Sequence, residues 1–143
     1  MGIGMLPQLN WLAVILGTIL YFALGAVWYM GFSPTGRIWM RAIGFEGHPE
    51  GQRPGGAIYL APLLAYVLVA VVTGMLARAL GVATITDGAY LGFLLWLGFG
   101  LPYWTLASVF NPHAKQPGTL ILVQSAYHLV GMLILGALFG LLH

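Results

Sequence analysis

Four long apolar stretches divide the chain, and short polar segments separate them. They cover residues 11–30, 58–80, 86–110 and 118–142. A helix needs about 20 apolar residues to cross the roughly 30 Å hydrocarbon core of a bilayer. The pattern therefore predicts an all-α integral membrane protein, in which four spanning helices form a single transmembrane domain over residues 1–143.

The amino-acid composition supports a membrane as the surrounding solvent. Hydrophobic residues make up 60% of the chain and charged residues only 6%, whereas a soluble domain carries about a quarter charged residues. Five Lys and Arg residues against three Asp and Glu residues are too few for a nucleic-acid-binding surface. The chain has no cysteine, which excludes disulfides and thiolate metal sites, and no two histidines have metal-ligand spacing, so no metal site is expected.

The connection between the first two stretches contains the signals of a short helix. Ser33 can cap its N-terminus, Pro34 suits its first turn, and Gly44 can end it. Basic residues then share one face and a tryptophan lies on the opposite face, which is typical of a helix in the headgroup region. We expect this interfacial helix to be anchored by Arg37, Trp39 and Arg41.

The third stretch has a helix start signal at its beginning and a proline in its second half. Thr86 is the expected N-cap, and Asp87 follows it at the positive end of the helix dipole. Pro102 is expected to kink the helix and to free the carbonyl near Gly98.

Small residues predict close helix packing in the last two stretches. Glycines four residues apart allow two helix backbones to approach closely. The residues expected at such contacts are Gly88, Gly92, Gly136 and Gly140. This packing would join the protein to a second copy or to other membrane subunits.

The last stretch carries polar side chains in its first half. His128 is the one histidine set well inside an apolar stretch, and a polar group there must face other helices or a cavity. The residues we expect to bind a ligand or cofactor are His128, Gln124, Ser125, Tyr127 and Trp96.

Three classes of function follow from these features. A non-catalytic structural or accessory subunit is favoured, because packing signals are many and reactive groups are few. In such a subunit His128 could ligate a haem or chlorophyll-type pigment, with Gly131 allowing its flat approach. The alternative is a small transporter or channel, whose cavity would be lined by His128, Gln124 and aromatic residues. An enzyme is not expected, because no catalytic constellation is found.

One segment resembles a known family. Asn10-Trp11, the run Leu24-Gly25-Ala26-Val27-Trp28-Tyr29, Ser33-Pro34 and Gly36-Arg37-Ile38-Trp39-Met40 are similar to those of small bacterial four-span proteins catalogued as domain of unknown function 1761. The resemblance implies a four-helix integral membrane protein of bacterial origin, and it brings no activity or catalytic residues. We expect its location to be the bacterial inner membrane.

The basic residues predict an orientation. The first and third connections share one side and hold Arg37, Arg41, Arg53 and Lys115, whereas the other side has only Arg78. The positive-inside rule then places both connections in the cytoplasm and both termini outside it.

Overall fold

Helices account for nearly all regular structure in this computed structural model, which describes residues 3–44 and 56–143. The helices of the four apolar stretches are α1 (Trp11–Tyr29), α3 (Leu60–Ala79), α4 (Ile85–Leu95), α5 (Leu101–Val109) and α6 (Pro117–Leu141). The other elements are η1 (Ile3–Gln8), α2 (Pro34–Ile43), η2 (Gly56–Tyr59) and the π-helical η3 (Trp96–Gly100). No strand occurs within the described residues, so the predicted all-α fold is confirmed.

Four helical segments of this described chain are long and apolar enough to cross a membrane. They are α1, α3, the continuous segment Ile85–Val109 formed by α4, η3 and α5, and α6. Their ends lie within two residues of the four predicted stretches. The length and composition of these helices indicate a membrane protein.

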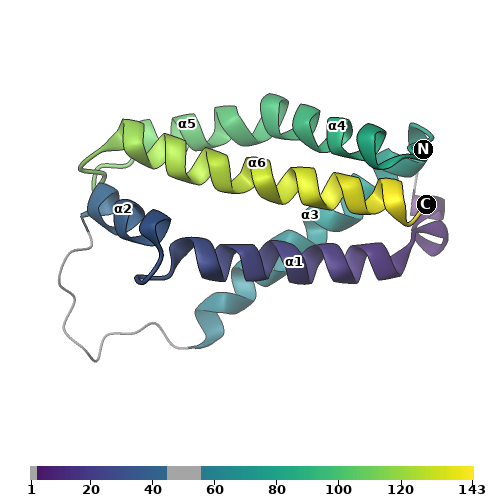
Figure 1. The fold of residues 1–143 in the computed structure, drawn as a ribbon, viewed down its shortest axis with the longest axis horizontal. Coiled ribbons are helices and arrows are strands. Elements are labelled where there is room, and N and C mark those ends of the chain that lie inside the picture. The colour runs from purple at the N-terminus through teal and green to yellow at the C-terminus, as the bar shows by residue number, and fades with distance from the viewer. Residues whose placement is uncertain (1–2, 45–55) are drawn as a thin grey trace.

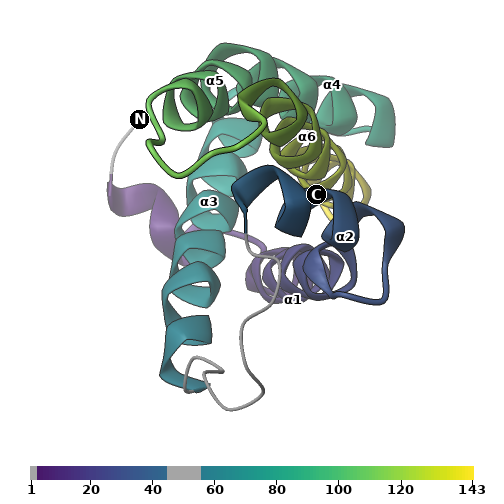
Figure 2. The ribbon, with the colours of Figure 1, turned by 90° about the vertical axis from the view of Figure 1, so that its left-hand side faces the viewer.

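Helix α6 runs through the centre of the bundle. The segment from α4 to α5 lies along one side of it, α1 lies along another, and α3 crosses the bundle obliquely (Figures 1 and 2). The two chain ends lie at one end of the bundle, where the Asn10 side chain donates a hydrogen bond to the Leu142 carbonyl. Helix α2 and the α5–α6 connection lie at the opposite end (Figure 1).

The closest packing in the bundle joins α4 to α6. A Cβ atom placed on Gly88 would overlap the backbone carbonyl of Gly136, and one placed on Gly136 would overlap the carbonyl of Gly88. Gly92 and Gly140 likewise lie against the carbonyls of Met132 and Thr84. The two predicted glycine pairs therefore face each other within one chain and are not exposed to a partner.

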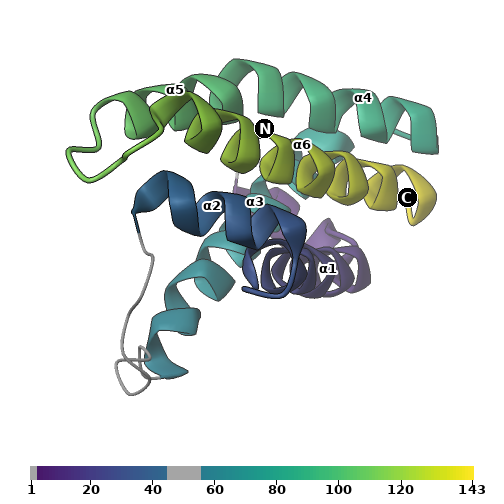
Figure 3. The same ribbon diagram turned by 60° about the vertical axis from the view of Figure 1, so that its left-hand side comes forward.

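Helix α2 forms where the sequence predicts it. The Ser33 side chain accepts a hydrogen bond from Gly36 N at 2.9 Å, and Gly44 ends the helix with a positive φ of 76°. The Ala42 carbonyl accepts hydrogen bonds from Lys115 N at 2.8 Å and from Gln116 N at 3.1 Å. These bonds hold α2 across the end of the bundle, beside α1 and α6 (Figure 3).

The predicted N-cap of the third span is wrong by two residues. Thr84, rather than Thr86, is the N-cap: its hydroxyl accepts from Asp87 N at 3.1 Å and donates to the Asp87 carboxylate at 2.7 Å. Both threonines can cap, but only Thr84 has an acidic residue three positions later, and this reciprocal arrangement satisfies the helix start best.

A π-helical turn precedes Pro102, where the sequence predicted a kink. The five residues of η3, Trp96–Gly100, are π-helical, and Leu101 N donates to the Trp96 carbonyl five residues earlier. An extra residue in the turn relieves the clash that a proline ring makes with the preceding turn. π-Helical turns are frequent at functional sites, and η3 forms part of the candidate site described below.

Candidate functional site

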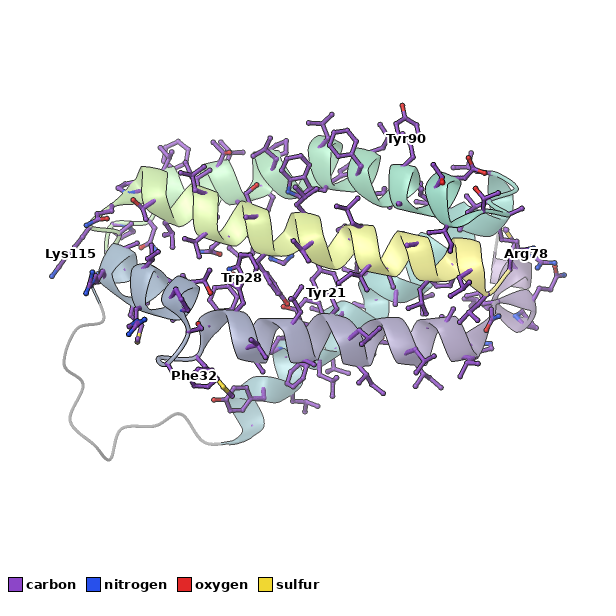
Figure 4. The ribbon with its side chains drawn as sticks, viewed as in Figure 1. Tyr21, Trp28, Phe32, Arg78, Tyr90 and Lys115 are labelled. Atoms are coloured by element: carbon purple, nitrogen blue, oxygen red, sulfur yellow. The ribbon has the colours of Figure 1, made fainter. Side chains whose placement is uncertain are left out.

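Aromatic side chains from four helices meet His128 in the interior of the bundle. Tyr21 comes from α1, Tyr66 from α3, Trp104 from α5, and Tyr127 with His128 from α6. We call these five residues the aromatic centre. Figure 4 shows Tyr21 pointing from α1 into the space between α1 and α6.

Tyr21 fixes the His128 ring through a hydrogen bond. The Tyr21 hydroxyl lies 2.7 Å from His128 Nδ1 and 3.4 Å from the His128 carbonyl oxygen. The Trp104 indole stacks on the face of the His128 imidazole, with ring centroids 4.9 Å apart and an interplanar angle of 16°. Among the described residues, the ring hydrogen bonds involve Nδ1 only, so Nε2 is the atom left for a ligand.

Tyr127 of α6 connects its own helix to α1 and α3 through its hydroxyl. Its side chain is only 1% exposed, and its hydroxyl donates to the Tyr21 carbonyl at 3.0 Å. The same hydroxyl lies 2.8 Å from the Tyr66 hydroxyl, within hydrogen-bond distance. Tyr66 also stacks on Tyr21 with centroids 4.5 Å apart. Gly25 makes room for this arrangement, because a Cβ there would lie 2.7 Å from the Tyr127 hydroxyl.

Two tryptophans bind the backbone of α6 from either side. Trp28 Nε1 donates to the Val123 carbonyl at 3.2 Å, and Trp96 Nε1 donates to the Ser125 carbonyl at 2.8 Å. A carbonyl has two lone pairs, so it can accept these bonds besides its helical one. The bonds fix α6 to α1 and to η3 around the aromatic centre.

A groove of about 630 Å³ lies between α3 and the η3–α5 segment. Its volume is within the roughly 300–1,000 Å³ typical of small-molecule sites. The residues that line it are apolar or aromatic, apart from Thr73 and His128, and none of these described residues is charged: they include Tyr21, Tyr66, Trp96, Trp104, His128 and Met132. Figure 2 shows α3 diverging from α5 along this side of the bundle.

The structure brings together only some of the residues expected from the sequence. His128 and Trp96 line the groove, and Tyr127 lies behind it in the aromatic centre. Ser125 is buried, and its hydroxyl has no hydrogen-bond partner among the described residues. Gln124 is half-buried and does not line the groove.

Tyr21 was not among the expected site residues, although it makes the main contact with His128. Its signal in the sequence is a phenol in the middle of an apolar span, where a polar group needs a partner. The identity of that partner depends on how α1 and α6 pack, which no local pattern encodes.

The pigment expected at His128 does not fit these surroundings. A Cβ atom on Gly131 would overlap the Tyr21 ring, so that ring already fills the approach expected for a flat macrocycle.

Groups that could add catalytic or metal chemistry do not gather here. His113 is exposed in the α5–α6 connection, and its backbone N–H donates to the Asn111 side chain; Glu46 lies outside the described residues. Within the described part of the chain, no three His, Asp or Glu residues could together hold a metal ion.

Comparisons with known proteins give one match. No curated protein and no solved structure matches the chain. A protein-family profile matches residues 12–140, which include all four apolar helices except for their outermost residues. The chain therefore belongs to the family described as "Protein of unknown function (DUF1761)".

Proposed function

We propose that this membrane protein binds a neutral amphipathic molecule, drawn from the bilayer, in the groove between α3 and α5. The observation that carries the proposal is His128 at a largely apolar groove between spanning helices. A largely apolar pocket with few convergent polar groups is the usual form of a small-molecule site. Binding of this kind fits the transporter alternative, in which His128 and aromatic residues line the path.

The lining favours an uncharged ligand. The described residues around the groove include no Asp, Glu, Lys or Arg. A charged group moved from water into such surroundings loses its hydration and gains no opposite charge, which is costly. A long apolar body with one hydroxyl or carbonyl group avoids this cost.

Tyr21 allows His128 to serve either as a donor or as an acceptor. When the Tyr21 hydroxyl donates to Nδ1, Nε2 carries the proton and can donate to a ligand carbonyl. When Tyr21 donates to the His128 carbonyl, Nδ1 carries the proton and Nε2 can accept from a ligand hydroxyl. Both arrangements keep the imidazole neutral.

The glycine contacts weaken the accessory-subunit hypothesis. Association with other subunits was expected through the four glycines, but these are used between α4 and α6 of the same chain. The orientation with both termini outside a bacterial inner membrane stays a proposal. It is supported by Lys115 at one end of the bundle and Arg78 at the other (Figure 4).

The test measures contact between a brominated alcohol and the groove tryptophans. The purified protein is reconstituted in phosphatidylcholine vesicles with increasing ω-bromododecanol, because bromine quenches tryptophan fluorescence on contact. We expect saturable quenching that weakens in Trp104→Phe, disappears when both groove tryptophans, Trp96 and Trp104, are replaced by Phe, and persists in Trp11→Phe, since Trp11 does not line the groove. The matching bromododecanoate and bromododecylammonium should show no saturable phase.

A matched pair of variants tests whether the groove is the site. Ala65 and Ala61 are both exposed alanines of α3, but only Ala65 lines the groove. Ala65→Phe should abolish the saturable phase, and Ala61→Phe should retain it. Equal saturable quenching in these two variants, or in the charged probes, would refute the proposal.

His128 can be tested for its hydrogen bond to the ligand. His128→Phe keeps a flat ring beside Trp104 and removes both ring nitrogens. One neutral hydrogen bond is worth about 0.5–1.5 kcal/mol, so affinity for the alcohol should fall roughly threefold to tenfold. Binding of bromododecane, which has no hydroxyl, should not change.

A further inference from the structure

A second cavity lies on the other side of Tyr66. It has a volume of about 630 Å³, and it is formed between the second half of α1 and the first turns of α3. Its lining is apolar apart from three phenols, and no described lining residue is charged: Phe22, Gly25, Ala26, Tyr29, Met30, Tyr59, Pro62 and Tyr66. Of the residues that the structure describes, Tyr66 alone lines both this cavity and the groove.

The burial of α3 explains why both cavities reach its first half. All of its buried residues, Ala70, Thr73, Gly74 and Ala77, belong to its second half. In the first half, Tyr66 reaches inward, stacks on Tyr21 and meets the Tyr127 hydroxyl. Its side chain therefore forms a wall between two spaces of similar size.

We propose that the cavity between α1 and α3 is a second site for a neutral amphipathic molecule, and that Tyr66 couples its occupancy to that of the groove. The inference rests on the proposed function in taking the same class of ligand. The phenol hydroxyls of Tyr29, Tyr59 and Tyr66 supply neutral hydrogen-bonding groups, and the remaining lining matches an apolar chain.

The coupling follows from the position of the wall. A ligand in the groove presses on one side of the Tyr66 side chain, and a ligand in the second cavity presses on the other side. If Tyr66 moves to enlarge one site, the other site becomes smaller. A ligand in the groove should therefore weaken binding in the second cavity, and a ligand in the second cavity should weaken binding in the groove. Such coupling is reciprocal between the two sites.

The experiment places a reporter in the second cavity. Tyr59 lines it and is 59% exposed, so Tyr59→Trp adds an indole there with little disturbance. In vesicles titrated with ω-bromododecanol, the emission added by this substitution should be quenched saturably. Ala26→Phe fills the second cavity and should abolish that quenching, whereas Ala23→Phe, an exposed site one turn earlier on α1, should not.

The coupling is read from the same reporter. In the Tyr59→Trp background, Ala65→Phe fills the groove and Ala61→Phe does not. We expect the quenching midpoint with Ala65→Phe to lie about fivefold or more above that with Ala61→Phe, which is the lower range of measured coupling between sites. Equal midpoints would overturn the role of Tyr66.

The two proposals fail in distinguishable ways. If Ala26→Phe leaves the reporter quenching unchanged, the second site is refuted whatever the groove does. If Ala65→Phe leaves quenching of Trp104 unchanged, the groove proposal is refuted while the second site can still stand. Circular dichroism of each variant checks that its helix content is retained.

Discussion

Tyr127→Phe removes one oxygen atom from the most enclosed part of the aromatic centre. The phenylalanine ring can keep the contacts with Tyr29 and Trp28, whose centroids lie 5.2 and 6.1 Å from that of Tyr127. The change therefore isolates two hydrogen-bond contacts, one to the Tyr21 carbonyl and one to the Tyr66 hydroxyl.

The expected loss in the free energy of unfolding depends on how much a hydrogen bond contributes to stability within a membrane. In soluble proteins each bond contributes about 0.5–1.5 kcal/mol, so two would give roughly 1–3 kcal/mol. Bonds between membrane helices average about 0.6 kcal/mol, which gives roughly 1.2 kcal/mol for two. We expect the free energy of unfolding to fall by about 1–2 kcal/mol, since Tyr127 is enclosed but the unfolded spans find other partners in the bilayer.

The assay is reversible unfolding in mixed micelles by increasing mole fraction of denaturing detergent, followed by circular dichroism. Tyr90→Phe is the matched control, because Tyr90 is 61% exposed and points away from the bundle (Figure 4). The control should change the free energy by less than about 0.5 kcal/mol. If both variants unfold alike, the hydroxyl of Tyr127 does not stabilise the centre and the reasoning is refuted.

Three further predictions concern the packing, the helix start and the orientation. Gly136→Ala forces a methyl group against the α4 backbone and should lower stability by about 1–3 kcal/mol in the same assay, whereas Gly118→Ala on the same helix meets open space and should not. Thr84→Ala should lower the free energy of unfolding by about 1 kcal/mol because it removes the N-cap, and Thr86→Ala should lower it by less than about 0.5 kcal/mol. A larger loss in Thr86→Ala than in Thr84→Ala would show that Thr86 is the cap. Because the chain has no cysteine, Lys115→Cys gives a single thiol: a membrane-impermeant maleimide should label it only after intact cells are permeabilised, and labelling before that would reverse the proposed orientation.

Local features of the sequence predicted the helices well. The spans follow from the number of consecutive apolar residues, and α2 follows from Ser33, Pro34 and Gly44, whose effects act within one turn. The start of α4 was harder, because two threonines compete for the cap and the choice depends on the residue three positions later.

The candidate site was less predictable because it depends on which helices become neighbours. His128 was found from its polarity, but Tyr21 and His128 are 107 residues apart, and their contact is a property of packing. The glycine pairs show the same limit. Their spacing predicts close contact, but it does not distinguish a helix of the same chain from a helix of another.

The central position of α6 has a consequence for synthesis. A ribosome makes the chain from its N-terminus, so α1, α3 and the α4–α5 segment enter the membrane before α6 does. Until then, the indole N–H groups of Trp28 and Trp96 lack the α6 carbonyls to which they donate, and Tyr21 lacks His128. The three earlier spans therefore lie in the bilayer with polar groups that lack their α6 hydrogen-bond partners. Insertion of α6 supplies these partners together and completes the interior of the protein.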